Sequence, residues 1–166
     1  MDSTQLRNLQ APLKDKYRAD PDAAIITLKA RGDLADGAIA CKVETGRALV
    51  EAGLHPATGG SGLEACSGDM LLEALVACAG VTLRAVATAM GITIRAGKVS
   101  ADGVWDARGT LGVDRAVPVG LTEVTLRFEV DADIDDAKRA RLIETAERYC
   151  VIYQTLKSPP RLSVAA

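Results

Sequence analysis

Aromatic side chains are scarce in this sequence, at 3% of 166 residues, and there is a single histidine. A core with so few rings must be built from aliphatic side chains, and apolar residues reach 48% of the chain. Basic residues are not in excess either, because 20 Lys and Arg are set against 22 Asp and Glu. This balance predicts no basic surface, so we do not expect a nucleic-acid partner. The length predicts one domain, residues 1–166, large enough to bury a real core.

The sequence also lacks the segments that target or anchor a chain. The first twenty residues are polar and charged and have no apolar stretch of the kind found in a signal peptide. The longest uncharged apolar run, residues 74–83, is too short to cross a bilayer. We therefore expect a cytoplasmic protein with no membrane partner. Its four cysteines are then expected to be reduced, so a cysteine pair would be catalytic or redox-sensing rather than structural.

Motifs for metals, hydrolases and nucleotides are missing as well. The cysteines, at positions 41, 66, 78 and 150, have no zinc-ligand spacing, and His55 before Pro56 is more typical of a turn. The stretch "GGSGLEA" lacks the last glycine of a G-x-S-x-G motif, and it does not fit a dinucleotide fingerprint. We read it as a flexible loop. The sequence predicts no bound metal and no bound cofactor.

Apolar periodicity predicts an α+β protein, because several strands precede a long helix and more strands and a second helix follow it. Residues 1–20 predict a helical extension at the N-terminus. Strands are predicted at 23–33, at two places within 37–56, at 92–109, at 121–133 and at 161–166. Helices are predicted at 68–91 and 133–150, and Gly91 is well placed to end the first of them.

The helix at 68–91 carries Cys78 near its middle, on a face that is otherwise apolar. A cysteine in such a place often packs as a small hydrophobe, so periodicity alone favours a core residue. The helix dipole lowers the pKa of a thiol in the first helical turn, and Cys78 lies beyond that turn. A Cys78 thiol with a low pKa would therefore need a cation supplied from elsewhere in the fold.

Two stretches resemble the OsmC/Ohr family, the osmotically inducible protein C and organic hydroperoxide resistance proteins. They are "DMLLEALVACAGVTLRAVA", which contains Cys78, and "AERYCVIYQTL", which contains Cys150. In the second stretch Val151 follows the cysteine, where the family often has proline. The resemblance covers residues 23–165. It implies an OsmC-like α+β fold with a mostly antiparallel curved sheet, a long buried central helix and an intertwined homodimer.

The resemblance also implies a thiol-dependent peroxidase for oxidative stress defence. Cys78 would be the peroxidatic thiolate and Cys150 the resolving thiol, acting on a small apolar hydroperoxide. An external dithiol reductant of the lipoyl type would restore both thiols. In the family an arginine oriented by a glutamate stabilises the thiolate. Here Asp69 or Glu73 would stand for the glutamate, and Arg47 is a candidate for the arginine.

Two other functions remain open at this point. One is an OsmC-like dimer that binds a small apolar ligand near Cys78 without turnover. The other is a redox sensor in which a disulfide changes the dimer. Cys41 has no role that the resemblance assigns and is expected on a strand. Cys66, in the loop before the long helix, is either a small loop residue or an alternative resolving thiol.

Overall fold

The structure is a computed structural model that describes residues 2–5, 8, 10–11, 19, 32–34, 40–44, 49–112 and 114–165, with the backbone alone at 32–34 and 40–44. The chain divides into two compact units. One comprises residues 1–26, 74–100 and 126–166, and we call it the cysteine-pair unit because it contains Cys78 and Cys150. The other comprises residues 27–73 and 101–125, and we call it the sheet unit.

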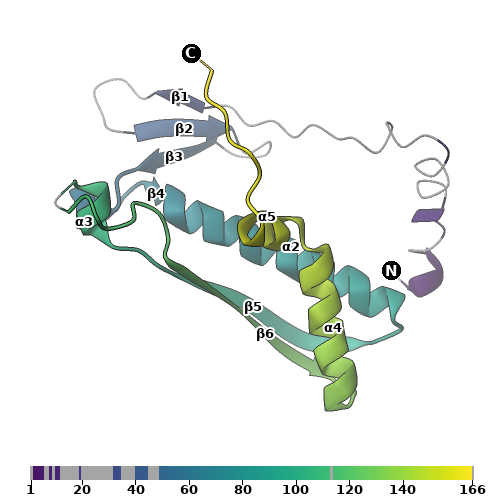
Figure 1. The fold of residues 1–166 in the computed structure, drawn as a ribbon. Coiled ribbons are helices and arrows are strands. Elements are labelled where there is room, and N and C mark those ends of the chain that lie inside the picture. Colours follow the sequence, from purple (N-terminus) through teal and green to yellow (C-terminus); the bar gives the residue numbers. More distant parts are fainter. Residues whose placement is uncertain are drawn as a thin grey trace. The chain divides into compact units, whose positions relative to one another are not determined.

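The sheet unit contains a four-stranded sheet in the order β1-β2-β3-β4 (Figure 1). Its strands are β1 (Gly32–Leu34), β2 (Ala40–Glu44), β3 (Leu49–Gly53) and β4 (Ala65–Cys66). β1, β2 and β3 pair antiparallel, and the short β4 runs parallel to β3. Two short helices, η2 (Pro56–Thr58) and α3 (Ala107–Thr110), belong to the same unit.

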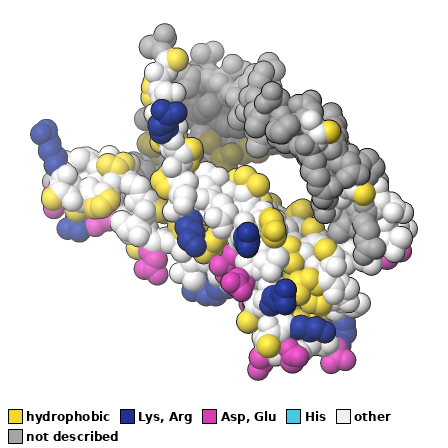
Figure 2. All heavy atoms as spheres, turned by 45° about the vertical axis from the view of Figure 1, so that its right-hand side comes forward, with side chains coloured by type: hydrophobic (Ala, Val, Ile, Leu, Met, Phe, Trp, Pro, Cys, Tyr) yellow, Lys and Arg dark blue, Asp and Glu magenta, His cyan; other side chains and the backbone are white. Residues whose placement is uncertain are grey.

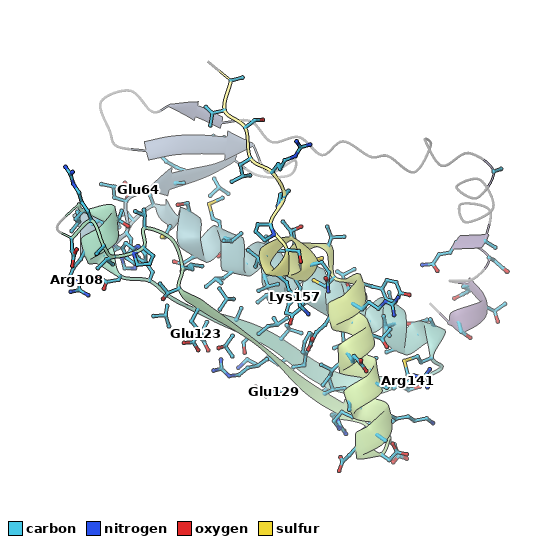
Figure 3. All side chains as sticks on the ribbon, in the orientation of Figure 1. Glu64, Arg108, Glu123, Glu129, Arg141 and Lys157 are labelled. Carbon is cyan, nitrogen blue, oxygen red and sulfur yellow. The ribbon has the colours of Figure 1, made fainter. Side chains whose placement is uncertain are left out.

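Three long elements have residues in both units: helix α2 (Ser67–Ala89) and strands β5 (Ile94–Val104) and β6 (Glu123–Ala132). β5 and β6 form a two-stranded sheet. Arg95 pairs with Asp131 at 2.5 Å, and the Thr122 N–H donates to the Val104 carbonyl at 2.8 Å, so the two strands run antiparallel. β6 alternates between exposed and partly buried side chains from Leu126 onward, as expected of a strand with one wet face. Glu123 and Glu129 lie along its exposed face (Figure 3).

The core of the cysteine-pair unit lies between α2, β5, β6 and α4 (Asp136–Tyr149). Its buried members are aliphatic: Leu83, Ala87, Ile94, Leu142 and Ala146. Phe128, the chain's single phenylalanine, packs against this cluster. Asp135 begins α4 by accepting a hydrogen bond from the Lys138 N–H at 2.7 Å, which satisfies a backbone donor that the helix leaves unpaired. A seven-residue helix, α5 (Val151–Lys157), follows α4 directly (Figure 1).

Helix α2 is the longest element, and glycine ends it as the sequence predicts. Gly91 has φ +67°, and the Ile92 N–H donates to the Ala87 carbonyl at 2.8 Å, which closes the last turn. By length and composition alone α2 is apolar enough to cross a membrane, a property that the core helix of a soluble protein shares. Only 22% of its most apolar window is buried within this chain.

Much of the predicted architecture is confirmed. The α+β class, the mostly antiparallel pairing, the long helix carrying Cys78, and strands within 37–56, 92–109 and 121–133 are all present. The helix predicted at 133–150 is also present, as α4, but the short helix α5 that begins directly after Cys150 was not predicted. One prediction was wrong, because residues 161–165 form no strand.

The predicted strand at 23–33 lies outside the described residues except for positions 32 and 33, which belong to β1. In the predicted N-terminal extension, positions 3–5, 8, 10–11 and 19 are helical and position 2 is not. The other positions lie outside the described residues, so the extension stays a prediction. Whether residues 1–166 behave as a single domain also stays a prediction.

Candidate active site

Cys78 lies beside the buried stripe of α2. That stripe consists of residues spaced four apart, Leu75, Ala79, Leu83 and Ala87, each less than 9% exposed. Cys78 is offset by one residue and is partly buried, so its sulfur lies at the margin of the core. Gly80 of the same helix faces β5, because a Cβ there would lie 3.8 Å from Cγ2 of Val99.

Cys150 lies at the end of α4, far from Cys78 in the sequence, and points into the same core. Leu142, Ala146 and Cys150 are spaced four apart, and all three are at most 1% exposed. The helical period therefore directs Cys150 inward together with the core residues of α4. Cys150 itself has an extended backbone, φ −75° and ψ 108°, and is both the last cap of α4 and the first cap of α5. The break between the helices leaves the first N–H groups of α5 without helical partners.

The structure brings the two sulfurs together. The thiol of Cys150 donates a hydrogen bond to the sulfur of Cys78. The backbone N–H groups of Ile152 and Val151, at the start of α5, also donate to the Cys78 sulfur. The fourth donor is the hydroxyl of Thr82, which lies one turn further along α2. Neither cysteine is in a disulfide in this structure.

These contacts shift the pKa values of the two thiols in opposite directions. Burial raises the pKa of Cys78, but the hydrogen bonds from Ile152, Cys150, Val151 and Thr82 outweigh it, so the pKa lies below its ordinary value. Burial is the largest cause that raises the pKa of Cys150, and the hydrogen bond and negative charge shared with Cys78 raise it further. The site therefore favours a thiolate at Cys78 beside a protonated thiol at Cys150.

Thr82 differs from three other threonines in helices. The hydroxyls of Thr88, Thr145 and Thr155 donate to the carbonyl four residues earlier, at 2.8, 2.6 and 2.8 Å. This is the usual bond of a threonine within a helix. The hydroxyl of Thr82 also lies close enough to the sulfur of Cys78 to lower the pKa of that thiol.

Within a single chain, the charged residues predicted to assist Cys78 are not among the groups around its sulfur. At 1.5 Å of rise per residue, about 13 Å along α2 separates Asp69 from Cys78, and Glu73 lies about 140° around the helix from it. Both carboxylates are exposed. Arg47 lies outside the described residues, and no Lys or Arg among those described contributes to the lowered pKa of Cys78. The roles of Asp69, Glu73 and Arg47 therefore stay predictions.

Two arginines that are close in sequence to the cysteines interact with other groups. Arg84 of α2 donates to the Ile94 carbonyl at 3.2 Å, and Arg148 lies over the ring of Tyr149 at 5.8 Å. Arg141 on α4 and Lys157 at the end of α5 are exposed (Figure 3). Within the described residues, no three His, Cys, Asp or Glu side chains gather to hold a metal ion.

Comparison with known proteins agrees with this fold and cysteine arrangement. The family model for OsmC-like proteins matches residues 60–165, which include α2, both long strands and both cysteines. The chain belongs to the OsmC-like protein family. A comparison with curated proteins finds no significant match.

Solved OsmC-like structures share the fold at low identity. The OsmC-like protein of Mycoplasma pneumoniae is 19% identical, with a TM-score of 0.66, over 81% of this chain and 89% of that one. An organic hydroperoxide resistance protein of Elizabethkingia anophelis is 18% identical, with a TM-score of 0.65, over 81% and 91%. One from Legionella pneumophila is 15% identical, with a TM-score of 0.63, over 81% and 91%. At these identities the likeness establishes the fold alone.

The OsmC-like sequence pattern located the cysteines but not their hydrogen-bond donors. The backbone donors belong to α5, the helix that begins directly after Cys150, and periodicity did not predict that helix. One signal was available: a valine at 151 keeps the backbone N–H that a proline at this position would remove.

Proposed function

We propose that this OsmC-like protein reduces organic hydroperoxides, with Cys78 as the peroxidatic thiolate and Cys150 as the resolving thiol. The observation that carries the proposal is the hydrogen bond between the two sulfurs, with the pKa of Cys78 lowered and that of Cys150 raised. Peroxide cleavage needs a thiolate at the attacking cysteine, and the lowered pKa of Cys78 favours that form. The organic hydroperoxide resistance proteins among the solved structures support the same chemistry.

The reaction has three balanced steps. The thiolate of Cys78 attacks the distal oxygen of ROOH, the O–O bond breaks, and RO⁻ takes up a proton to leave as an alcohol. Cys78 is then a sulfenic acid, and the sulfur of Cys150 displaces its hydroxyl, which leaves as water as the disulfide forms. An external dithiol, of the lipoyl type in our proposal, exchanges with the disulfide and is itself oxidised to a disulfide, restoring both thiols.

Neutral donors take the place of a cation around the Cys78 thiolate in this proposal. The Val151 and Ile152 N–H groups and the Thr82 hydroxyl each donate to the sulfur without needing a buried counter-ion. The surrounding side chains of α2, among them Leu75 and Ala79, are apolar and buried. This environment suits an alkyl or aryl hydroperoxide better than hydrogen peroxide, because burial of apolar substrate surface is favourable.

We propose that the working form is a cytoplasmic homodimer. Figure 2 shows acidic and basic side chains interspersed on the face in view, with apolar side chains between them. On α2, Val81 is 72% exposed, and a helix this apolar is normally covered. A second copy of the chain would cover it.

The test is a reaction of the reduced protein with one equivalent of cumene hydroperoxide, followed by peptide mass spectrometry. We expect a Cys78–Cys150 disulfide within seconds, and a trapped sulfenic acid at Cys78 in the Cys150→Ser variant. Cys66→Ser is the matched control and is expected to form the same disulfide. A Cys78 that stays reduced for minutes in excess peroxide would falsify the peroxidase and leave a ligand-binding dimer. Oxidation without turnover on added dihydrolipoamide would point to a redox sensor.

A further inference from the structure

A cavity of about 530 Å³ lies within the sheet unit. It is bounded by the end of β3 and η2, the first turns of α2, the end of β5 and residues 119–121. Its apolar lining consists of Leu54, Leu71, Leu72, Trp105, Val119 and Leu121. This volume is within the range of sites that hold small molecules, and an apolar lining with a few polar groups is typical of such sites. Neither Cys78 nor Cys150 lines it.

One wall of the cavity is a loop with a closely defined backbone. The carbonyl of His55 accepts hydrogen bonds from the Thr58 N–H at 2.8 Å, the Thr58 hydroxyl at 2.9 Å and the Gly60 N–H at 3.2 Å. A Cβ at Gly60 would lie 1.6 Å from the Leu54 carbonyl oxygen, so only glycine fits there. The loop thus holds His55, the chain's single histidine, at the cavity in one orientation.

The side chains of His55 and Trp105 are held as well. Nδ1 of His55 accepts from the Ala57 N–H at 3.0 Å, so in the neutral ring the proton is on Nε2, which remains a donor. The indole N–H of Trp105 donates to Thr110 Oγ1 at 2.8 Å. The two rings meet edge to face, with centroids 5.4 Å apart and an interplanar angle of 77°. Flat aromatic surfaces fixed in this way are suited to contact another ring.

The charged side chain at the cavity limits the charge of the compounds that can bind there. Asp69 is its acidic side chain, and none of the described Lys or Arg residues lines it. A carboxylate, phosphate or sulfonate would meet Asp69 without a compensating cation, whereas a neutral or singly cationic compound would not be repelled. The thiol of Cys66, partly buried, also lines the cavity and offers a chemical label for its occupancy.

We infer that this cavity is a binding site for a small, flat, apolar compound that is neutral or carries one positive charge. It contacts Trp105 and receives a hydrogen bond from His55 Nε2. The site is additional to the peroxidase chemistry proposed above, and its occupancy does not depend on the redox state of Cys78 and Cys150. The residues that carry it are the fixed His55–Trp105 pair, Asp69 and Cys66.

Two dyes that differ by a single group test the inference. N-phenyl-1-naphthylamine is neutral, and 1-anilinonaphthalene-8-sulfonate has the same rings with one negative charge. Trp105 is the only tryptophan in the chain, so energy transfer from tryptophan to a bound dye reports on its surroundings. We expect saturable transfer to the neutral dye, with an affinity at least about fivefold higher than for the sulfonate. Asp69→Asn is expected to reduce that difference, mainly by tightening sulfonate binding.

Alkylation of Cys66 is an independent test of whether the dye occupies the cavity. Peptide mass spectrometry follows modification of each cysteine by N-ethylmaleimide, with and without saturating neutral dye. Slower modification at Cys66, with Cys78 unaffected, is the expected result. The inference is overturned if the sulfonate binds as tightly as the neutral dye, or if the dye leaves the modification rate of Cys66 unchanged. Both readings are obtained without peroxide, so they stand whether or not the protein proves to be a peroxidase.

Discussion

At the scale of single residues, the site shows how a thiolate can be favoured without an adjacent cation. A sulfur that is partly buried has a raised pKa unless hydrogen bonds favour its charged form. At Cys78 four donors do so, and two of them are backbone N–H groups whose positions are set by the start of α5. Neutral donors fixed by the fold need no reorganisation when charge develops, which is the general basis of electrostatic preorganisation.

Thr82→Val should raise the pKa of Cys78, because it removes a hydroxyl donor while nearly preserving the side-chain volume. A single hydrogen bond contributes about 0.5–1.5 kcal/mol, so alkylation of Cys78 by iodoacetamide at pH 7 should slow about two- to tenfold. The rate follows the thiolate fraction, so its midpoint should move to higher pH. Thr82→Ser keeps the donor and should behave as the parent. Equal rates in all three proteins would exclude a role for this hydroxyl.

Val151→Pro should weaken the same thiolate without unfolding α5. Proline has no backbone N–H, so one donor to Cys78 is lost. Position 151 is the first residue of the helix and its side chain is 63% exposed, and proline is well tolerated there. We expect Cys78 to titrate at higher pH with an unchanged melting temperature. Val151→Ala is the control. A fall in melting temperature with no change in the titration would show that Val151 has a structural role only.

The sequence located the two cysteines but not the groups around them. Both cysteines were found because their flanking motifs resemble the family, and the helical period explains why Cys150 points inward. The donors were missed because a backbone N–H carries no mark in the sequence, and Thr82 could equally have bonded to the carbonyl of Cys78. The suggested partners Asp69 and Glu73 share α2 with Cys78, and helix geometry keeps both away from the sulfur within one chain.

At the scale of secondary structure, the long apolar helix was predictable because a glycine follows it and its period is sustained over 23 residues. The end of α4 agrees with the helix predicted to end at residue 150, but the start of α5 directly after it was not predicted. The residues at this junction, "ERYCVIYQTL", contain no glycine or proline, so local propensity does not mark a break between two helices. The break is stabilised by new bonds instead: the Gln154 N–H donates to the Cys150 carbonyl at 3.0 Å, and the Gln154 side chain donates to the Glu147 carbonyl at 2.9 Å.

Gly91→Ala should destabilise the end of α2. Gly91 has φ +67°, and a Cβ there would meet nothing within 4 Å, so backbone strain alone would oppose the change. The cost of the left-handed conformation for alanine is about 1–2 kcal/mol, measurable as a lower urea midpoint with an unchanged slope. Gly120→Ala is the matched control, because it also has open space but no positive φ. Equal midpoints for the two variants would contradict the assignment of Gly91 as the helix stop.

At the scale of the whole molecule, much of the apolar surface of α2 is not covered by the rest of the described chain. The most apolar window of α2 is 22% buried within the chain, whereas Leu142, Ala146 and Cys150 are almost fully covered. The fold class was predictable because the pattern of strands and helices is strong. The partner for α2 was not derivable from periodicity, because an apolar face has the same pattern whether a sheet, a membrane or a second copy covers it.

Val81→Glu should therefore convert a dimer into a monomer. Val81 is 72% exposed on α2, and a buried, unpaired carboxylate in an interface between two copies would be strongly unfavourable. Val164→Glu is the control, because Val164 is 97% exposed near the C-terminus and outside any helix or strand. Sedimentation velocity should give twice the chain mass for the parent and the control, and a concentration-dependent loss of dimer for Val81→Glu. Since α2 also carries Cys78, dissociation should expose that thiol and speed its alkylation. A parent protein that sediments as a monomer would mean that the apolar face of α2 is covered by something other than a second copy.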